Sequence, residues 1–376
     1  MRMFANLLLI VSIYNAGCNF LRAEAPPSST ELNRARVVIP IADRSVVAIG
    51  WPRSVHWADA AIWVQQKSGE LADVDIAKIL GGLPPQGLDL HGTASGQRFA
   101  WICLNTHSDR IANRVFSIDP EGNVRQHPPI PTVSWIAPRL AKLIETNEGL
   151  VAICRDPCDT WEECEAADWK SEAQHFLLKS NVWREIKIRV GEAPAQELFA
   201  NRDSVVAVTA EYREEGIKLR WVSSKTLAGC FDKDPQEHLV DFTPSRKQIY
   251  FGASEGAVLP FYGTEPAGDK WFLLDTANPN SAVMPVSVTQ DYRIHQIAVD
   301  AANRLAIGAT STAVSPDAHA TLFVGVAAPS RERIHAEIEW TRKQSVETQH
   351  WIFNEVETDF VFGEPFINWR CSAIGI

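Results

Sequence analysis

The chain of 376 residues has no cluster of basic residues. It contains 36 Lys and Arg against 46 Asp and Glu, which gives a net charge of −10 at pH 7. A nucleic-acid-binding surface concentrates positive charge to meet the phosphate backbone, so this composition argues against a nucleic-acid partner. The 22 Pro and 21 Gly are scattered, which excludes a low-complexity chain. With 45% hydrophobic residues, the chain is long enough to bury a sizeable core.

Several catalytic and cofactor motifs are also missing. The chain has no Walker A loop, no HExxH, no G-x-G-x-x-G and no c-type haem motif. Residues 252–256 (GASEG) match the G-x-S-x-G elbow of hydrolases, but residues 257–260 (AVLP) cannot form the helix that follows a nucleophile there. We therefore do not expect Ser254 to be catalytic, and we expect no cofactor and no metal.

The long apolar segments that cross membranes are absent as well, and the clearest apolar run lies at the N-terminus. Arg2 precedes the run Leu7–Tyr14, and small residues follow, an order typical of a secretory signal peptide over residues 1–23. The run is shorter than the roughly 18 residues of a spanning helix. We expect cleavage near Ala23, export to the periplasm or the extracellular space, and no transmembrane segment. Residues 15–18 (NAGC) partly match a bacterial lipobox, so acylation of Cys18 and a lipid anchor are the alternative.

Six cysteines follow the predicted signal peptide, an even number that suits an oxidising compartment. Cys158 and Cys164 flank a short acidic stretch, and we expect them to close a small disulfide loop. Cys103 and Cys154 end apolar runs and suit free, buried thiols. The carboxylates of residues 156–168 lack the ligand spacing of an EF-hand, so we expect a solvated acidic insertion and not a calcium site.

A frame of about 14 residues recurs after residue 36. Each copy has a short apolar run, a polar turn and a second run rich in Val, Ile and Phe. The copies are 37–50, 90–103, 141–154, 196–209, 238–252, 295–308 and 350–363. Runs this short, separated by turn-forming residues, predict β-hairpins. One or two further strand candidates follow most copies, so about four strands recur in roughly every 50 residues.

This repeat resembles a seven-bladed β-propeller that covers residues 37–376. The resemblance implies an all-β fold, with residues 24–36 as a linker or as a strand that closes the ring. The chain has no Trp-Asp ends, kelch double glycine or Asp-box, so no particular propeller family is indicated. Two sandwiches in series are the alternative architecture. The only helices expected are short ones at Asp73–Leu80 and Ala137–Leu143.

Three frames begin with a histidine: His238, His295 and His350. In a propeller the first strand of each blade lines the central channel, so three imidazoles from consecutive blades could converge there and hold a metal. Because no carboxylate partner recurs with them, we prefer ordinary polar contacts with water or backbone carbonyls.

Aromatic, basic and imidazole side chains gather in the segments that follow the frames. In a propeller the links between the second and third strands lie at one end of the ring, usually the end that binds ligands. The predicted binding face consists of Trp51, Arg53, His56, Trp57, His107, Asp109, Arg110, Trp161, Tyr212, Arg213 and Tyr262. Such rings beside Arg and His suit a protein or a carbohydrate ligand.

Together these features favour a non-enzymatic module of the bacterial envelope that binds a ligand or acts as a scaffold. Analogy between folds is the basis, because propellers host hydrolases, lyases and adaptors alike. The alternative is an extracytoplasmic carbohydrate-active hydrolase or lyase that uses the same face. Two or three carboxylates at a pocket between 51–59, 104–113 and 155–174 would favour the enzyme.

Overall fold

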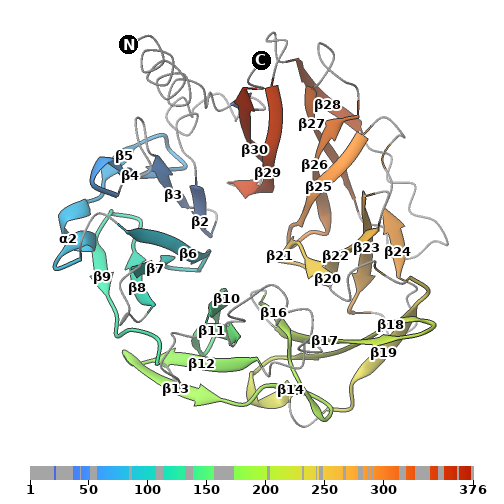
Figure 1. Ribbon diagram of the computed structural model, residues 1–376. Coiled ribbons are helices and arrows are strands. Elements are labelled where there is room, and N and C mark those ends of the chain that lie inside the picture. The colour runs from blue at the N-terminus through green and yellow to red at the C-terminus, as the bar shows by residue number, and fades with distance from the viewer. Residues whose placement is uncertain are drawn as a thin grey trace, which may run out of the picture.

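The computed structural model of the chain is a ring of small antiparallel sheets around a central axis (Figure 1). It describes residues 21–22, 37–42, 44–50, 57–83, 87–106, 113–131, 139–155, 173–200, 204–230, 233–242, 244, 249–265, 268–277, 283–286, 288, 292–312, 319–326, 339–345, 351–361 and 364–373. The ring confirms the predicted all-β propeller. Over these residues, the helices are α2 (Ile76–Leu80) and the 3₁₀ turns η2 (Trp57–Asp59) and η3 (Ala228–Cys230), and no helix is long and apolar enough to cross a membrane.

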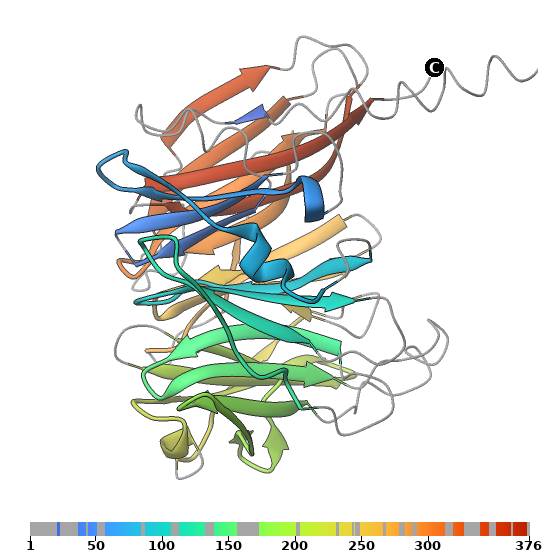
Figure 2. The ribbon, with the colours of Figure 1, turned by 90° about the vertical axis from the view of Figure 1, so that its left-hand side faces the viewer.

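The first three blades are four-stranded sheets with their strands in sequential order. Blade 1 contains β2 (Val37–Ile41), β3 (Ser45–Gly50), β4 (Ala61–Gln66) and β5 (Leu71–Asp73). Blade 2 contains β6 (Leu88–Ala94), β7 (Ala100–Thr106), β8 (Arg114–Ile118) and β9 (Val124–Gln126). Blade 3 contains β10 (Arg139–Thr146), β11 (Gly149–Arg155), β12 (Gln174–Lys179) and β13 (Val182–Ile186). In the side view the sheets of these blades stack one above another (Figure 2).

The next three blades continue the ring. Blade 4 contains β16 (Glu197–Ala200), β17 (Val205–Arg213), β18 (Gly216–Ser224) and β19 (Gln236–Val240), after a small hairpin of β14 (Arg189–Val190) and β15 (Ala193–Pro194). Blade 5 contains β20 (Ile249–Phe251), β22 (Val258–Glu265), β23 (Gly268–Asp275) and β24 (Met284–Val286). Blade 6 contains β25 (Tyr292–Val299), β26 (Arg304–Ser311), β27 (His319–Val326) and β28 (Glu339–Ser345), with β21 (Ala253–Ser254) added in parallel to β25.

A three-stranded sheet lies between blade 6 and blade 1 (Figure 1). It contains β29 (Trp351–Val361), β30 (Glu364–Ala373) and the short β1 (Leu21–Arg22), in the order β1-β30-β29. Six blades are therefore complete, and this sheet lies in the ring between the last of them and the first. The strand that joins it is β1. Residues 24–36, where we expected a closing strand, lie outside the described residues.

The hydrophobic core lies between neighbouring blades, because inner strands such as β3 and β17 bury residues on both of their faces. In β17, Val206 and Val208 pack toward blade 5, whereas Val205 and Ala207 pack toward blade 3. Successive side chains of a strand point to opposite faces of the sheet, so a strand buried on both faces reads as a continuous apolar run. This explains why the frames have apolar runs and not a strict alternation of apolar and polar residues.

The structure corrects three details of the repeat. Residues 238–252 do not form one hairpin, because β19 is the rim strand of blade 4 and β20 is the inner strand of blade 5. Residues 350–363 contain the single long strand β29 and not a hairpin. The helix expected at Ala137–Leu143 is also wrong, since Arg139–Thr146 forms strand β10. The other expected helix is present as α2, where the Asp75 carboxylate accepts a hydrogen bond from the Ala77 amide.

Candidate functional site

Most of the predicted binding face lies outside the described residues. This applies to Trp51, Arg53, His56, His107, Asp109, Arg110 and Trp161, and also to Cys18, Cys158, Cys164 and His350. The structure places only Trp57, Tyr212, Arg213 and Tyr262 of that face.

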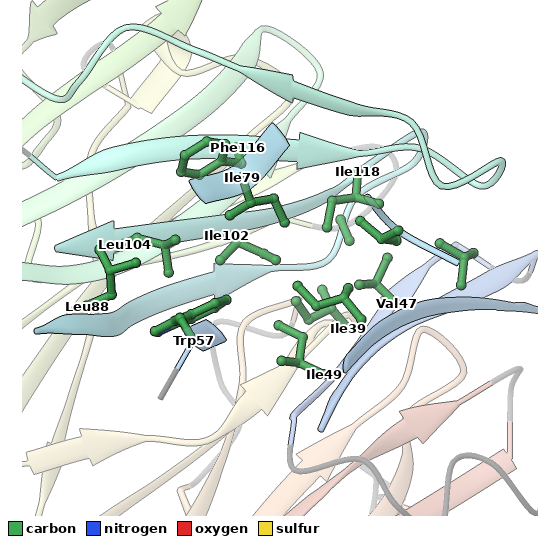
Figure 3. Close-up of a cluster of buried hydrophobic side chains, with 14 of the residues drawn as sticks. Ile39, Val47, Ile49, Trp57, Ile79, Leu88, Ile102, Leu104, Phe116 and Ile118 are labelled. Carbon is green, nitrogen blue, oxygen red and sulfur yellow. The ribbon is translucent and has the colours of Figure 1, made fainter. Parts of the chain in front are cut away.

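Trp57 belongs to the core and not to a binding face. Its side chain is 2% exposed and packs in the cluster between blades 1 and 2 with Ile49, Leu88 and Leu104 (Figure 3). The 3₁₀ turn η2, directly before β4, carries Trp57 inside the ring of apolar residues. The prediction that this indole is an exposed ligand contact is therefore wrong.

Tyr212 and Arg213 end strand β17 and are held by neighbours within blade 4. Tyr212 is half-buried and packs on the cluster between blades 4 and 5. The Arg213 guanidinium contacts Glu211 at 3.2 Å and Glu215 at 3.9 Å, and Glu211 also pairs with Arg220. Because these charges compensate one another, this part of the predicted face gives no clear ligand contact.

The structure does not place His238 in the central channel, and His350 lies outside the described residues. His295 lies on β25, the first strand of blade 6, but His238 lies on β19 at the outer rim of blade 4. Among the described residues, no group of three His, Cys, Asp or Glu side chains is placed to hold a metal ion.

The Ser254 hydroxyl is engaged by its own turn, as a structural residue would be. Its Oγ donates to the Val258 carbonyl oxygen at 2.8 Å and accepts from the Gly256 amide at 3.2 Å. Strand β21 that carries it pairs in parallel with β25 and leads into no helix. These observations agree with the expectation that Ser254 is not a nucleophile.

Three cysteines, Cys103, Cys154 and Cys230, are free and buried. Cys103 and Cys154 lie in the cluster between blades 2 and 3, as expected from the apolar runs that they end. Burial raises the pKa of the Cys154 thiol to about 12 and that of Cys230 to about 11, so both stay protonated and unreactive at neutral pH.

A hydrogen-bond network between blades 2 and 3 was not predicted from the sequence. His127 Nε2 lies 2.8 Å from Ser117 Oγ, and its Nδ1 lies 2.9 Å from Asn181 Oδ1. A hydroxyl, an imidazole and an orienting oxygen in this order are the arrangement of a nucleophile and its base. Ser117 is only 1% exposed, however, so a substrate cannot reach its hydroxyl. These hydrogen bonds therefore join blades 2 and 3.

The one predicted face residue in a promising environment is Tyr262. On adjacent strands of blade 5, the rings of Tyr250 and Tyr262 stack with centroids 5.1 Å apart, and Tyr262 lies 4.4 Å from Trp271. Register explains this row, because Tyr262 is directly opposite Tyr250 on β20 and opposite Trp271 on β23. Trp271 is buried, whereas the two tyrosines are half-buried. We call these three residues the aromatic row.

Charged and polar groups border the aromatic row where β22 turns into β23. Thr264 Oγ1 donates to Asp269 Oδ1 at 2.9 Å, which fixes the carboxylate. Arg293 at the start of β25 places its Nη2 3.6 Å from Asp269 Oδ2, so this ion pair spans blades 5 and 6. Burial raises the pKa of Tyr262 to about 12, with a smaller contribution from Asp269, so its hydroxyl remains protonated.

A β-bulge sets the position of His295 beside this group. The pairing of β25 with β26 shifts between Ile294 and Gln296, which leaves His295 as the extra residue. Its Nε2 lies 2.8 Å from Thr310 Oγ1. Burial lowers the pKa of His295, and the Arg293 charge lowers it further, so the imidazole is neutral at pH 7. Tyr250, Tyr262, Trp271, Asp269, Arg293 and His295 form what we call the Tyr262 site.

Comparison with known proteins finds neighbours by structure only. No protein-family model and no curated protein match the chain. A post-proline cleaving enzyme from Rickettsia typhi aligns with 90% of this chain and 50% of its own, at 9% identity and a TM-score of 0.47. A prolyl endopeptidase aligns with 100% of this chain and 53% of its own, at 9% identity and a TM-score of 0.48. A puromycin-hydrolysing peptidase from Mycobacterium tuberculosis aligns with 89% of this chain and 49% of its own, at 12% identity and a TM-score of 0.47. The chain spans about half the length of these structures.

These neighbours are all peptidases, which contradicts the expected non-enzymatic binding or scaffold module. That expectation is therefore corrected, and any activity of this chain is a matter for proposal. At 9–12% identity and TM-scores below 0.5 the likeness transfers no activity to this chain, so any particular activity has to be argued from its own residues.

Proposed function

We propose that this chain is the propeller of a hydrolytic enzyme that acts on peptides, and that the Tyr262 site contacts the substrate. The observation that carries the proposal is the aromatic row bordered by the Asp269–Arg293 pair. The site lies where the second strand of blade 5 turns into the third, the end of the ring at which the sequence predicted ligand contacts.

The chemistry of the site favours a peptide over a carbohydrate. Arg293 has a half-exposed guanidinium with five N–H donors, and the Tyr262 hydroxyl is protonated and able to donate. Its one carboxylate, Asp269, is already held by Thr264 and Arg293. A site richer in donors than in acceptors suits peptide carbonyl oxygens better than sugar hydroxyls, which need both.

The site supplies substrate contacts, and the proposal assigns it no catalytic residue. Ser117 is buried and Ser254 is engaged in a turn, so neither is a nucleophile in the described part of the chain. Half-buried aromatic side chains that pack on a substrate typically contribute about 2 kcal/mol each to binding.

The test is hydrolysis by the purified full chain of a panel of blocked peptides and a panel of oligosaccharides, followed by mass spectrometry. We expect cleavage of peptides and a higher KM for Tyr262→Ala, by roughly tenfold or more. Tyr212→Ala is the matched control, because Tyr212 is also a half-buried tyrosine but belongs to blade 4. Cleavage of oligosaccharides alone, or of nothing in either panel, would overturn the proposal.

A further inference from the structure

Arg293 is the most exposed charged group of the Tyr262 site. Its side chain is 57% exposed, whereas its partner Asp269 is 18% exposed. Their closest atoms are 3.6 Å apart, which is an ion contact but too long for a good hydrogen bond. In the part of the chain that the structure describes, Arg293 has no other ion partner, so its N–H groups are available to a ligand.

The carboxylate of Asp269 decides what kind of acceptor Arg293 can take. Thr264 holds one oxygen of Asp269 at 2.9 Å, and the other faces the guanidinium. The pair is therefore neutral overall, and His295 beside it is neutral as well because burial lowers its pKa. A free carboxylate on a ligand would approach Asp269 as closely as it approaches Arg293, and the like charges would repel.

We propose that Arg293 is a specificity-determining residue that donates to carbonyl oxygens of an uncharged peptide segment, while Asp269 compensates its charge and excludes a free carboxylate. The segment lies against the rings of Tyr250 and Tyr262, with its carbonyl groups toward blade 6. This inference rests on the proposed peptide hydrolysis and names the part of the substrate that the same site reads. Asp269 touches no reacting atom: it compensates the charge of Arg293 and repels a free carboxylate.

The decisive variant is Asp269→Asn, measured with pairs of peptides that differ only in a C-terminal amide or a free carboxylate. In the wild type we expect the amide to bind more tightly. Asn keeps an oxygen that Thr264 can donate to but removes the negative charge, so the preference should reverse by about tenfold in KM toward the free carboxylate. Loss of packing alone would weaken both peptides equally.

Arg293→Gln should raise the KM for the amide about tenfold, and Arg293→Lys should rescue it only partly because Lys lacks the planar fork. The matched control is Glu197→Gln, which removes the carboxylate of another ion pair between blades, Lys142–Glu197 at 3.1 Å. This control should leave the preference between the two peptides unchanged.

Binding and hydrolysis are measured separately, so the two proposals can fail independently. Binding is followed by calorimetry with the same amide and carboxylate peptides. Binding with the predicted reversal but without cleavage would overturn the hydrolase and keep the role of Arg293. Cleavage with no change of preference in Asp269→Asn would overturn the role of Arg293 and Asp269 and keep the hydrolase.

Discussion

Replacing Trp57 by Ala tests whether this indole is part of the core. The side chain is 2% exposed and is among the largest fully buried side chains of the described residues. A buried aromatic side chain removes roughly 150–250 Å² from water. At about 25 cal/mol per Å² this gives an upper value of roughly 4–6 kcal/mol. Measured Trp or Phe to Ala changes in cores cost about 3–5 kcal/mol, so we expect a loss of about 4 kcal/mol.

The assay is urea unfolding followed by far-UV circular dichroism, because the change removes a fluorophore. We expect an unchanged slope, a lower midpoint and a melting temperature lower by roughly 5 °C. Trp57→Phe should lose much less, since it fills part of the space between Ile49 and Leu104. A loss below about 1 kcal/mol for Trp57→Ala, the size of a surface effect, would refute the assignment of this residue to the core.

The remaining predictions concern titration, hydroxyl chemistry and oxidation. Burial lowers the pKa of His127 in the folded protein, so the unfolded chain binds the proton more tightly. The free energy of unfolding should therefore be highest above about pH 6.5 and fall as the pH drops toward the pKa of the folded state. In urea unfolding, His127→Gln should reduce this dependence of stability on pH. Ser254→Ala should leave kcat unchanged and cost about 1 kcal/mol from the lost turn hydrogen bonds, whereas abolished hydrolysis would contradict the structural role. Cys158 and Cys164 should be disulfide-bonded in exported protein, so reduction should add the mass of two hydrogen atoms. Free alkylation of both thiols in native protein would contradict this.

The repeat and the fold were predictable because each strand has a local sequence signal, a short apolar run next to turn-forming residues. The frames at 37–50 and 295–308 contain apolar runs on both sides of a polar turn, and both are inner hairpins of a blade. The frame at 238–252 failed because β20 has only three residues, so the rim strand β19 of the preceding blade completed the pattern. A short strand carries too little sequence signal to compete with a longer neighbour.

The Tyr262 site was only partly predictable. The order of strands within one blade was enough to place Tyr262 near the turn between the second and third strands. The pair Asp269–Arg293 could not, because it depends on how blades 5 and 6 pack against each other. The contact of His127 with Asn181 joins residues 54 positions apart in two blades, and single-sequence patterns do not report such distant contacts.

The pairing of Leu21 and Arg22 with β30 places two residues of the predicted signal peptide in the three-stranded sheet. If the exported chain is cut after Ala23, the three-stranded sheet loses β1 and retains β29 and β30. If it is instead cut ahead of Cys18, as a lipoprotein is, β1 is retained and pairs with β30. The residue at which the mature protein starts would then determine whether an N-terminal strand closes the propeller. N-terminal sequencing of the exported protein would identify both the cleavage site and the presence of this strand.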